Sequence, residues 1–336
     1  MKKTQPPVPR NLPGIVHWSA LLVLLMFSVP VLPQVSQEEP QAPEAAQEKP
    51  ATAIARPMIS TGVDAEAIAR KRPDTAVWLT GRNQERVLAL FQPEQDSPAK
   101  GALVILADEG VSSASGLADA LRGPLSQDGW AVMTLGLPAP PFAVQRWLRQ
   151  QSNAQPDVAK KPTEKPPEEK ADDGQSSVMI NLMETETPND ALNQYRDQVV
   201  SSLTAAVDAL SERDYGRIVL AGVGRAAGHV TRQAREDGRA TDLIWIAPHF
   251  YADESSGLAG LLASAASPSI LELYSTFPGD RTLDRSARER AAALERAGIA
   301  GYRRQPVAMA RQPQPREARM LANRISSWLR STSKTP

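Results

Sequence analysis

The chain has 336 residues with 38 cationic and 38 acidic side chains, so no general basic field exists to attract nucleic acid. It contains no cysteine, which excludes disulfide bridges, thiolate metal sites and cysteine nucleophiles. The 29 prolines gather in a few polar stretches, which predicts one folded domain with low-complexity segments rather than two domains.

The first 33 residues have the layout of an export signal. Lys2, Lys3 and Arg10 precede the apolar run 20–27, and no acidic residue occurs before position 33. A cleaved signal peptide over residues 1–33 is the first interpretation. An inner-membrane tether through residues 14–33 is the alternative, because that stretch would just span a bilayer. Both predict a periplasmic address for the rest of the chain.

Two later segments are too polar to build a core. Residues 34–59 consist largely of Gln, Glu, Ala and Pro, a composition that predicts a disordered linker. Residues 152–189 combine charge runs with prolines and predict a low-complexity insertion. The folded domain is therefore expected over residues 60–331, interrupted by this insertion.

Strand and helix patterns alternate along the first half of the domain. A short helix is expected at 63–70, followed by two strands, 76–80 and 86–91, that are joined by a turn. The apolar run 102–107 predicts a strand covered on both faces, and it ends in Asp108, Glu109 and Gly110. A helix with Leu117, Leu121 and Leu125 on one face then leads to a strand at 130–137.

The alternation continues after the insertion. A helix is expected to begin with Asn189 or Asp190 as its N-cap and to carry an apolar stripe as far as Leu210. The later expected elements are a strand at 218–222, a helix to about 236, strands at 242–247, 270–274 and 301–307, a helix at 284–297, and a last helix around 318–328. This order predicts a doubly wound, mostly parallel sheet.

The central strand ends in a tight turn made of Gly222, Val223, Gly224 and Arg225, and a small-residue helix follows at once. Such a strand, turn and helix can hold a nucleophile in a strained backbone position. Here the nucleophile position is Gly224, which has no side chain. The same glycines partly match a dinucleotide-binding fingerprint, yet no acidic residue occurs near position 247, where such a site needs one.

The order of elements and the turn together resemble the α/β-hydrolase fold over most of residues 78–329. More narrowly, the chain resembles an uncharacterised family of exported α/β-hydrolase-like proteins of Gram-negative bacteria, in which a His typically stands where this chain has Val223. The residues that carry this likeness are Leu121, Arg122, Leu125, the triplet Asp128, Gly129 and Trp130, the pair Leu137 and Pro138, the turn 222–224 and the run 271–274.

The resemblance implies a catalytic triad whose roles can be assigned one by one. No His follows the last strand, in residues 308–311. His249 and Asp280 each follow a predicted strand, and the carboxyl ends of parallel strands meet at one edge of a sheet. Asp108, Glu109 and Gly110 occupy the position of the oxyanion loop, where two carboxylates would oppose a developing negative charge.

These observations favour a non-hydrolytic binding or scaffolding module of the bacterial cell envelope with a degenerate catalytic turn. The expected partner is a small molecule or an envelope protein, with no cofactor, no metal and no nucleic acid. The alternative is a hydrolase with unusual machinery around His249 and Asp280, to which the loop would bring Ser112 or Ser113 as the nucleophile.

Overall fold

The computed structural model describes residues 64–154, 187–263, 268–278 and 281–333. The expected signal or tether, the linker and most of the predicted insertion lie outside these residues, and so does Asp280. In the described part of the chain, no helix combines the length and the apolar character that a membrane crossing needs.

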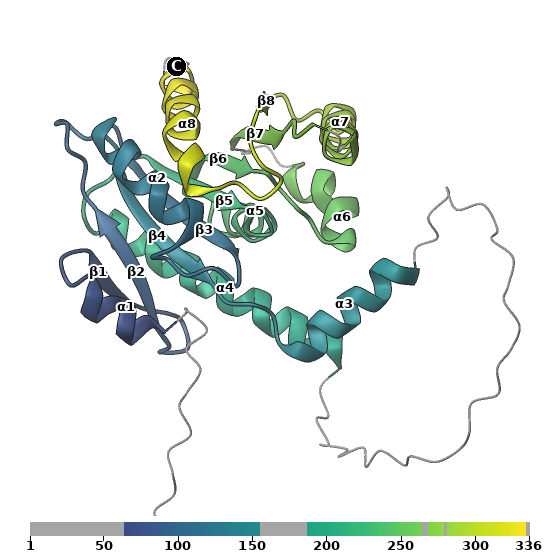
Figure 1. The fold of residues 1–336 in the computed structure, drawn as a ribbon, viewed down its shortest axis with the longest axis horizontal. Helices are drawn as coiled ribbons and strands as arrows, with labels where there is room; N and C mark the ends of the chain where they lie inside the picture. The colour runs from purple at the N-terminus through teal and green to yellow at the C-terminus, as the bar shows by residue number, and fades with distance from the viewer. Residues whose placement is uncertain (1–63, 155–186, 264–267, 279–280, 334–336) are drawn as a thin grey trace, which may run out of the picture. The chain divides into compact units, whose positions relative to one another are not determined.

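The sheet has eight strands in the order β1-β2-β4-β3-β5-β6-β7-β8, and Figure 1 shows the helices distributed over its two faces. The strands are β1 Ala76–Thr80, β2 Arg86–Gln92, β3 Ala102–Glu109, β4 Ala131–Leu137, β5 Ile218–Val223, β6 Ala240–Ile246, β7 Ser269–Ser275 and β8 Tyr302–Val307. β2 runs antiparallel to both of its neighbours, and the remaining pairs are parallel. The predicted α/β-hydrolase-type sheet is confirmed.

Two apolar layers enclose the sheet. One layer contains α2 Gly116–Gln127 and α8 Ala318–Thr332, which lie against each other on one face. The other contains residues of α4 Pro188–Ser211, α5 Ala226–Asp237, α6 Ala252–Leu262 and α7 Arg281–Arg296. The central strands β3 and β5 are buried on both faces, which explains their continuous apolar runs.

The helix boundaries refine the expectations from sequence. α1 covers Ala65–Lys71, close to the predicted range. α4 begins earlier than predicted: its N-cap is Thr187, whose hydroxyl accepts a hydrogen bond from the Asp190 amide at 3.2 Å. Neither Asn189 nor Asp190 is the cap, because Pro188 takes the first helical position, where its missing N–H costs nothing.

Two helices were not predicted. α3 Phe142–Ala154 has a short apolar stripe of Val144, Trp147 and Leu148 that packs on the core, while Phe142 is 64% exposed. α6 contains Gly257 and Gly260, and its N-cap is Tyr251, a residue type that rarely caps helices. The glycines weaken the helical signal of α6, and in α3 the stripe is confined to its first half.

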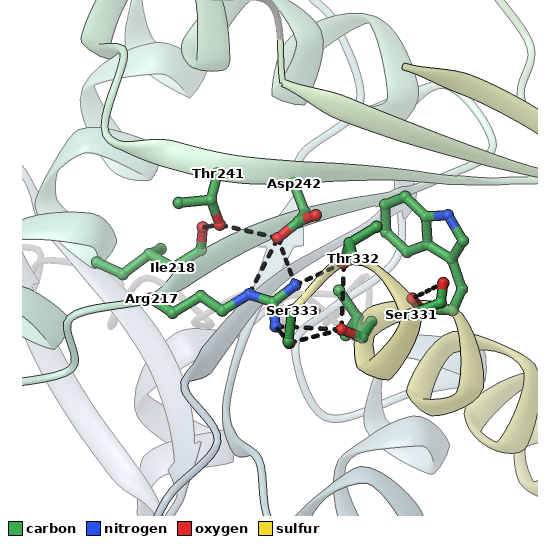
Figure 2. A network of polar contacts seen from close by, with 9 residues as sticks. Arg217, Ile218, Thr241, Asp242, Ser331, Thr332 and Ser333 are labelled. Carbon is green, nitrogen blue, oxygen red and sulfur yellow. Dashed lines mark hydrogen bonds and ion pairs between the residues drawn. The ribbon is translucent and has the colours of Figure 1, made fainter. Parts of the chain in front are cut away.

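At the amino end of the central strands, Arg217 joins the sheet to the end of α8 (Figure 2). Its guanidinium donates to the Asp242 carboxylate at 2.8 Å and 3.1 Å, and to the Thr332 hydroxyl at 2.7 Å. It also donates to the Leu329 carbonyl at 3.1 Å and to the Ser333 hydroxyl. A cation at a helix C-terminus satisfies free carbonyls and complements the helix dipole, so Arg217 anchors the last helix.

Candidate functional site

The turn after β5 has the backbone geometry of a catalytic elbow. Gly224 has a φ of 58°, in the left-handed region that other L-residues adopt at a cost of about 1–2 kcal/mol. Its N–H donates to the Ile246 carbonyl at 2.9 Å, and its carbonyl accepts from the His249 N–H at 3.0 Å. Both bonds tie the turn to the end of β6, so the turn is held rigidly at the carboxyl edge of the sheet.

Gly222 has a packing role rather than a ligand-binding one. A Cβ atom at this position would lie 2.6 Å from the carbonyl carbon of Ala226, because the first turn of α5 crosses directly over the end of β5. Only glycine allows this approach. The glycine pattern that partly matches a dinucleotide fingerprint is thus explained by contact between strand and helix.

The Asp108 carboxylate fills the space in which a side chain on residue 224 would stand. A Cβ atom on Gly224 would lie 2.3 Å from Asp108 Oδ2 and 2.4 Å from Oδ1. Asp108 Oδ1 accepts hydrogen bonds from the backbone N–H of Arg225 at 2.8 Å and of Glu109 at 2.9 Å. In α/β-hydrolases the oxyanion is held by the N–H after the nucleophile and by an N–H of the loop after β3.

The backbone N–H groups of Glu109 and Arg225 are therefore both engaged by the chain's own Asp108 carboxylate. The sequence had indicated only that negative charge near this loop would oppose an oxyanion. The structure adds a steric effect: Asp108 occupies the space in which a side chain at position 224 would stand, so a larger residue there would clash with the carboxylate. Two backbone N–H groups without an acceptor would form an anion-binding site. Here Asp108 of the same chain is the acceptor.

Glu109 lies beside the turn, in contact with Tyr251 and Arg225. It accepts a hydrogen bond from the Tyr251 hydroxyl, and its other oxygen lies 3.9 Å from Arg225 Nε. The Arg225 guanidinium lies 4.2 Å from the centroid of the Tyr251 ring, a cation–π contact. Burial raises the pKa of Glu109, and burial together with the bond to Glu109 raises the pKa of Tyr251.

An ionic cluster lies next to this contact; its Arg196 and Glu254 side chains are largely buried, and its Asp253 side chain is exposed. The Arg196 guanidinium of α4 donates to Asp253 at 2.7 Å and lies 3.4 Å from Glu254 Oε1, and both carboxylates belong to the first turn of α6. Glu254 also accepts from the Tyr251 N–H at 3.2 Å, and burial raises its pKa. Sequence reasoning missed these residues because it did not predict α6; the acidic pair at 253–254 was the available signal.

His249 borders a cleft of about 600 Å³ at the carboxyl edge of the sheet. Burial lowers its pKa, and the nearby Asp108 carboxylate partly opposes that shift. The cleft is also lined by Arg225, Tyr274, Arg311 and hydroxyl groups of α6 and α7. Because Asp280 lies outside the described residues, the proposed pairing of these two side chains has no geometry to report.

Ser112 and Ser113 lie in a different place. Both are buried, at 5% and 3% exposure, and they line a separate cavity of about 220 Å³ between α1, α4 and the start of the sheet's antiparallel part. The Ser112 hydroxyl lies 2.9 Å from the Ser115 hydroxyl. No residue lines both this cavity and the cleft of His249, so the structure does not bring these serines to that histidine.

His229 is a buried histidine beneath the turn. It lies on α5, is 1% exposed and makes a T-shaped contact with the Tyr195 ring, with 5.4 Å between ring centroids. Neither ring nitrogen has a hydrogen-bond partner within the described residues. Burial, with the positive charges of Arg196 and Arg232, lowers its pKa to about 3, so the ring is neutral at physiological pH.

No cluster of three potential metal-ligating side chains occurs among the residues with described positions. The carboxylates near the turn are instead engaged by backbone N–H groups, Tyr251 and arginines. The chemistry available at this edge of the sheet is therefore hydrogen bonding and ion pairing around a rigid turn.

Solved structures with a similar architecture include three esterases. The esterase domain of a Rhodothermus marinus protein is 13% identical, with 76% of this chain and 97% of that chain covered and a TM-score of 0.46. Est1E from Butyrivibrio proteoclasticus is 9% identical, with 78% and 100% covered and a TM-score of 0.47. A Pyrococcus furiosus esterase is 10% identical, with 76% and 91% covered and a TM-score of 0.47.

A comparison with curated proteins finds no match. A comparison with protein families finds one match, which covers residues 18–331 and so nearly the whole chain. The matching family is described as a protein of unknown function, DUF3530. Because this match covers nearly the whole chain, the chain belongs to the DUF3530 family.

Proposed function

We propose that this chain is a non-hydrolytic binding module of the bacterial cell envelope, built on an α/β-hydrolase fold. The observation that carries the proposal is the position of Asp108. Its carboxylate stands where a nucleophile on residue 224 would stand, and it accepts from the two N–H groups that would stabilise an oxyanion. Ester cleavage through this turn lacks both the attacking atom and a free oxyanion site.

The cleft beside His249 is the place proposed for a ligand. Ligand sites in open parallel sheets lie at the carboxyl ends of the strands, and this cleft borders β6 and β7 there. Its lining combines the arginines 225 and 311 with hydroxyl groups of Ser255, Ser256 and Ser286. Such a lining suits a small polar molecule that accepts several hydrogen bonds.

The test is turnover of p-nitrophenyl acetate and labelling by a fluorophosphonate probe. The wild type, Gly224→Ser and the double variant Asp108→Ala/Gly224→Ser are all expected to match the uncatalysed rate. A serine hydroxyl is a poor nucleophile without an adjacent base, and no His follows β8. Wild-type turnover above background would contradict the proposal.

The alternative, a hydrolase that uses His249, is supported by one observation. The lowered pKa leaves His249 neutral at pH 7 beside the cleft, so it could accept a proton. Wild-type turnover that disappears in His249→Ala, but persists in Asp108→Ala, would favour this alternative over the binding module.

The envelope address is a separate part of the proposal and rests on the charged and apolar pattern of residues 1–33. Alkaline phosphatase fused after residue 60 should be active, because the enzyme folds only after export. An inactive fusion, with an active cytoplasmic reporter at the same point, would contradict the address and leave the question of hydrolysis untouched.

A further inference from the structure

A groove of about 810 Å³ separates the edge strand β8 from one side of α8. Arg303 and Gln305 line it from the strand; they are two residues apart and therefore lie on the same face of the sheet. The residues that line it from the other wall recur every three or four positions, as on one face of a helix. They include Arg316, Arg319, Asn323, Ser327 and Ser331.

Four guanidinium groups stand along this groove, from Arg303, Arg316, Arg319 and Arg324, and all four residues are exposed. None of them forms an ion pair within the part of the chain that the structure describes. The adjoining carboxylate, Glu317, is engaged by two backbone N–H groups of its own loop. Like charges gathered in one groove create a positive potential that favours an anionic occupant.

The positions of these arginines indicate which class of anionic ligand can bind in the groove: a membrane surface, a second copy of the chain or a peptide. Guanidinium groups come from both walls, so the anionic groups must enter between strand and helix, which a flat bilayer surface cannot do. A second copy of the same groove would bring arginines against arginines. An extended peptide with carboxylate side chains fits, because Arg binds carboxylates in a bidentate geometry.

The edge strand itself is poorly suited to strand addition. The carbonyls of Gly301 and Val307 bond to β7, so in the alternating ladder Pro306 lies on the free edge, where it offers no N–H. Recognition would therefore depend on side chains. The partly exposed Met320 adds apolar surface between the arginines, which an aliphatic part of a peptide could cover.

We propose that the groove between β8 and α8 binds an extended acidic segment of a partner protein. The proposal rests on no property of the elbow turn or of the cleft beside His249. α8 has 15 residues and is about 22 Å long, so about seven residues of extended peptide would span it. The opposing guanidinium and carboxylate groups supply the affinity, which falls as salt concentration rises.

The test measures fluorescence anisotropy of a labelled oligoglutamate of about seven residues with the full-length protein. The matched variants are Arg303→Ala/Arg324→Ala, in the groove, and Arg330→Ala, an exposed residue of α8 outside it. We expect saturable binding that the double variant weakens at least about tenfold and the control less than about twofold. Oligoglutamine should not bind, and circular dichroism verifies that each variant is folded.

Several outcomes would overturn the proposal. One is the absence of saturation up to about 1 mM peptide, which corresponds to about 4 kcal/mol of binding free energy. Another is an equal loss of affinity in Arg330→Ala and in the double variant. Tighter binding to phosphatidylglycerol vesicles, or to single-stranded DNA of the same charge, with the same dependence on Arg303 and Arg324, would assign the groove to a lipid surface or to nucleic acid instead.

Discussion

The Oδ1 atom of Asp108 lies 2.8 Å from the backbone nitrogen of Arg225, the donor that directly follows the elbow glycine. This one contact connects the end of β3 to the start of α5 across the site where an α/β-hydrolase would attack its substrate. It places a carboxylate group against the backbone N–H groups of Glu109 and Arg225. Residues 108 and 224 are therefore coupled, and both stability and anion binding should reveal that coupling.

Removing the carboxylate should open an anion site. In Asp108→Ala the N–H groups of Glu109 and Arg225 lose their shared acceptor, so acetate or formate should bind there. At ten times its dissociation constant, acetate would stabilise the variant by about 1.4 kcal/mol, measured as a rise in Tm. The wild type should not respond to acetate beyond the general effect of salt.

Asp108→Asn is the matched control for that measurement. An amide oxygen can still accept from both N–H groups, so the Tm of this variant should be insensitive to acetate. An equal acetate response in the Asn and Ala variants would show that the anion binds elsewhere.

Gly224→Ala should be strongly destabilising. The new Cβ meets the Asp108 carboxylate at 2.3 Å, and the backbone has a φ of 58°. Strain and overpacking together should lower the free energy of unfolding by about 2–4 kcal/mol. The loss should shrink in Asp108→Ala/Gly224→Ala, because the double variant removes the steric part, and urea unfolding of the four proteins gives the coupling energy.

Gly257→Ala should raise the free energy of unfolding, in contrast to Gly224→Ala. Gly257 lies inside α6, and its added Cβ meets no atom within 4 Å, so alanine should stabilise the helix by about 0.5–1 kcal/mol. If both glycine variants changed stability equally, the steric role assigned to Asp108 would be wrong.

Arg217→Ala should release the end of α8. Asp242 is 3% exposed, and without Arg217 its charge would be buried with only Thr241 to donate to it, so a loss of about 3–5 kcal/mol is expected. Hydrogen exchange should accelerate in the last turn of α8 and much less in β3. Arg217→Lys should recover only part of the stability, because an ammonium group cannot reach Asp242, Thr332 and Leu329 together.

Acid should destabilise the fold through His229. The pKa of His229 is lowered from 6.5 to about 3 by burial, so on acidification the unfolded chain takes up a proton that the folded chain does not. Stability is unaffected above pH 6.5 and is lost progressively as the pH falls towards 3. At pH 5 this histidine alone should cost about 2 kcal/mol.

His229→Phe isolates this contribution. Phenylalanine keeps an aromatic ring against Tyr195 and has no nitrogen to protonate or to leave without a partner. Urea unfolding at pH 7 and pH 5 should show a smaller loss of stability in the variant than in the wild type. Parallel losses in the two proteins would mean that other groups govern the response to acid.

Most of the fold could be predicted because its signals are local. The apolar runs of β3 and β5 are strands buried on both faces, and the stripe from Leu192 to Leu210 is the buried side of α4. The missed elements have weak local signals: α6 contains two glycines and begins after Tyr251. The position of the elbow followed from the glycines at the end of β5.

The amino-acid sequence by itself determined the order of strands and helices, the absence of a side chain at Gly224 and the lack of a histidine after β8. Only the tertiary structure decided what fills that position. The contact between Asp108 and the turn joins residues more than a hundred positions apart, and it exists because β3 and β5 are adjacent parallel strands that end at the same edge. Sequence patterns report how each segment buries its own surface; which side chains meet at a sheet edge depends on strand order and register.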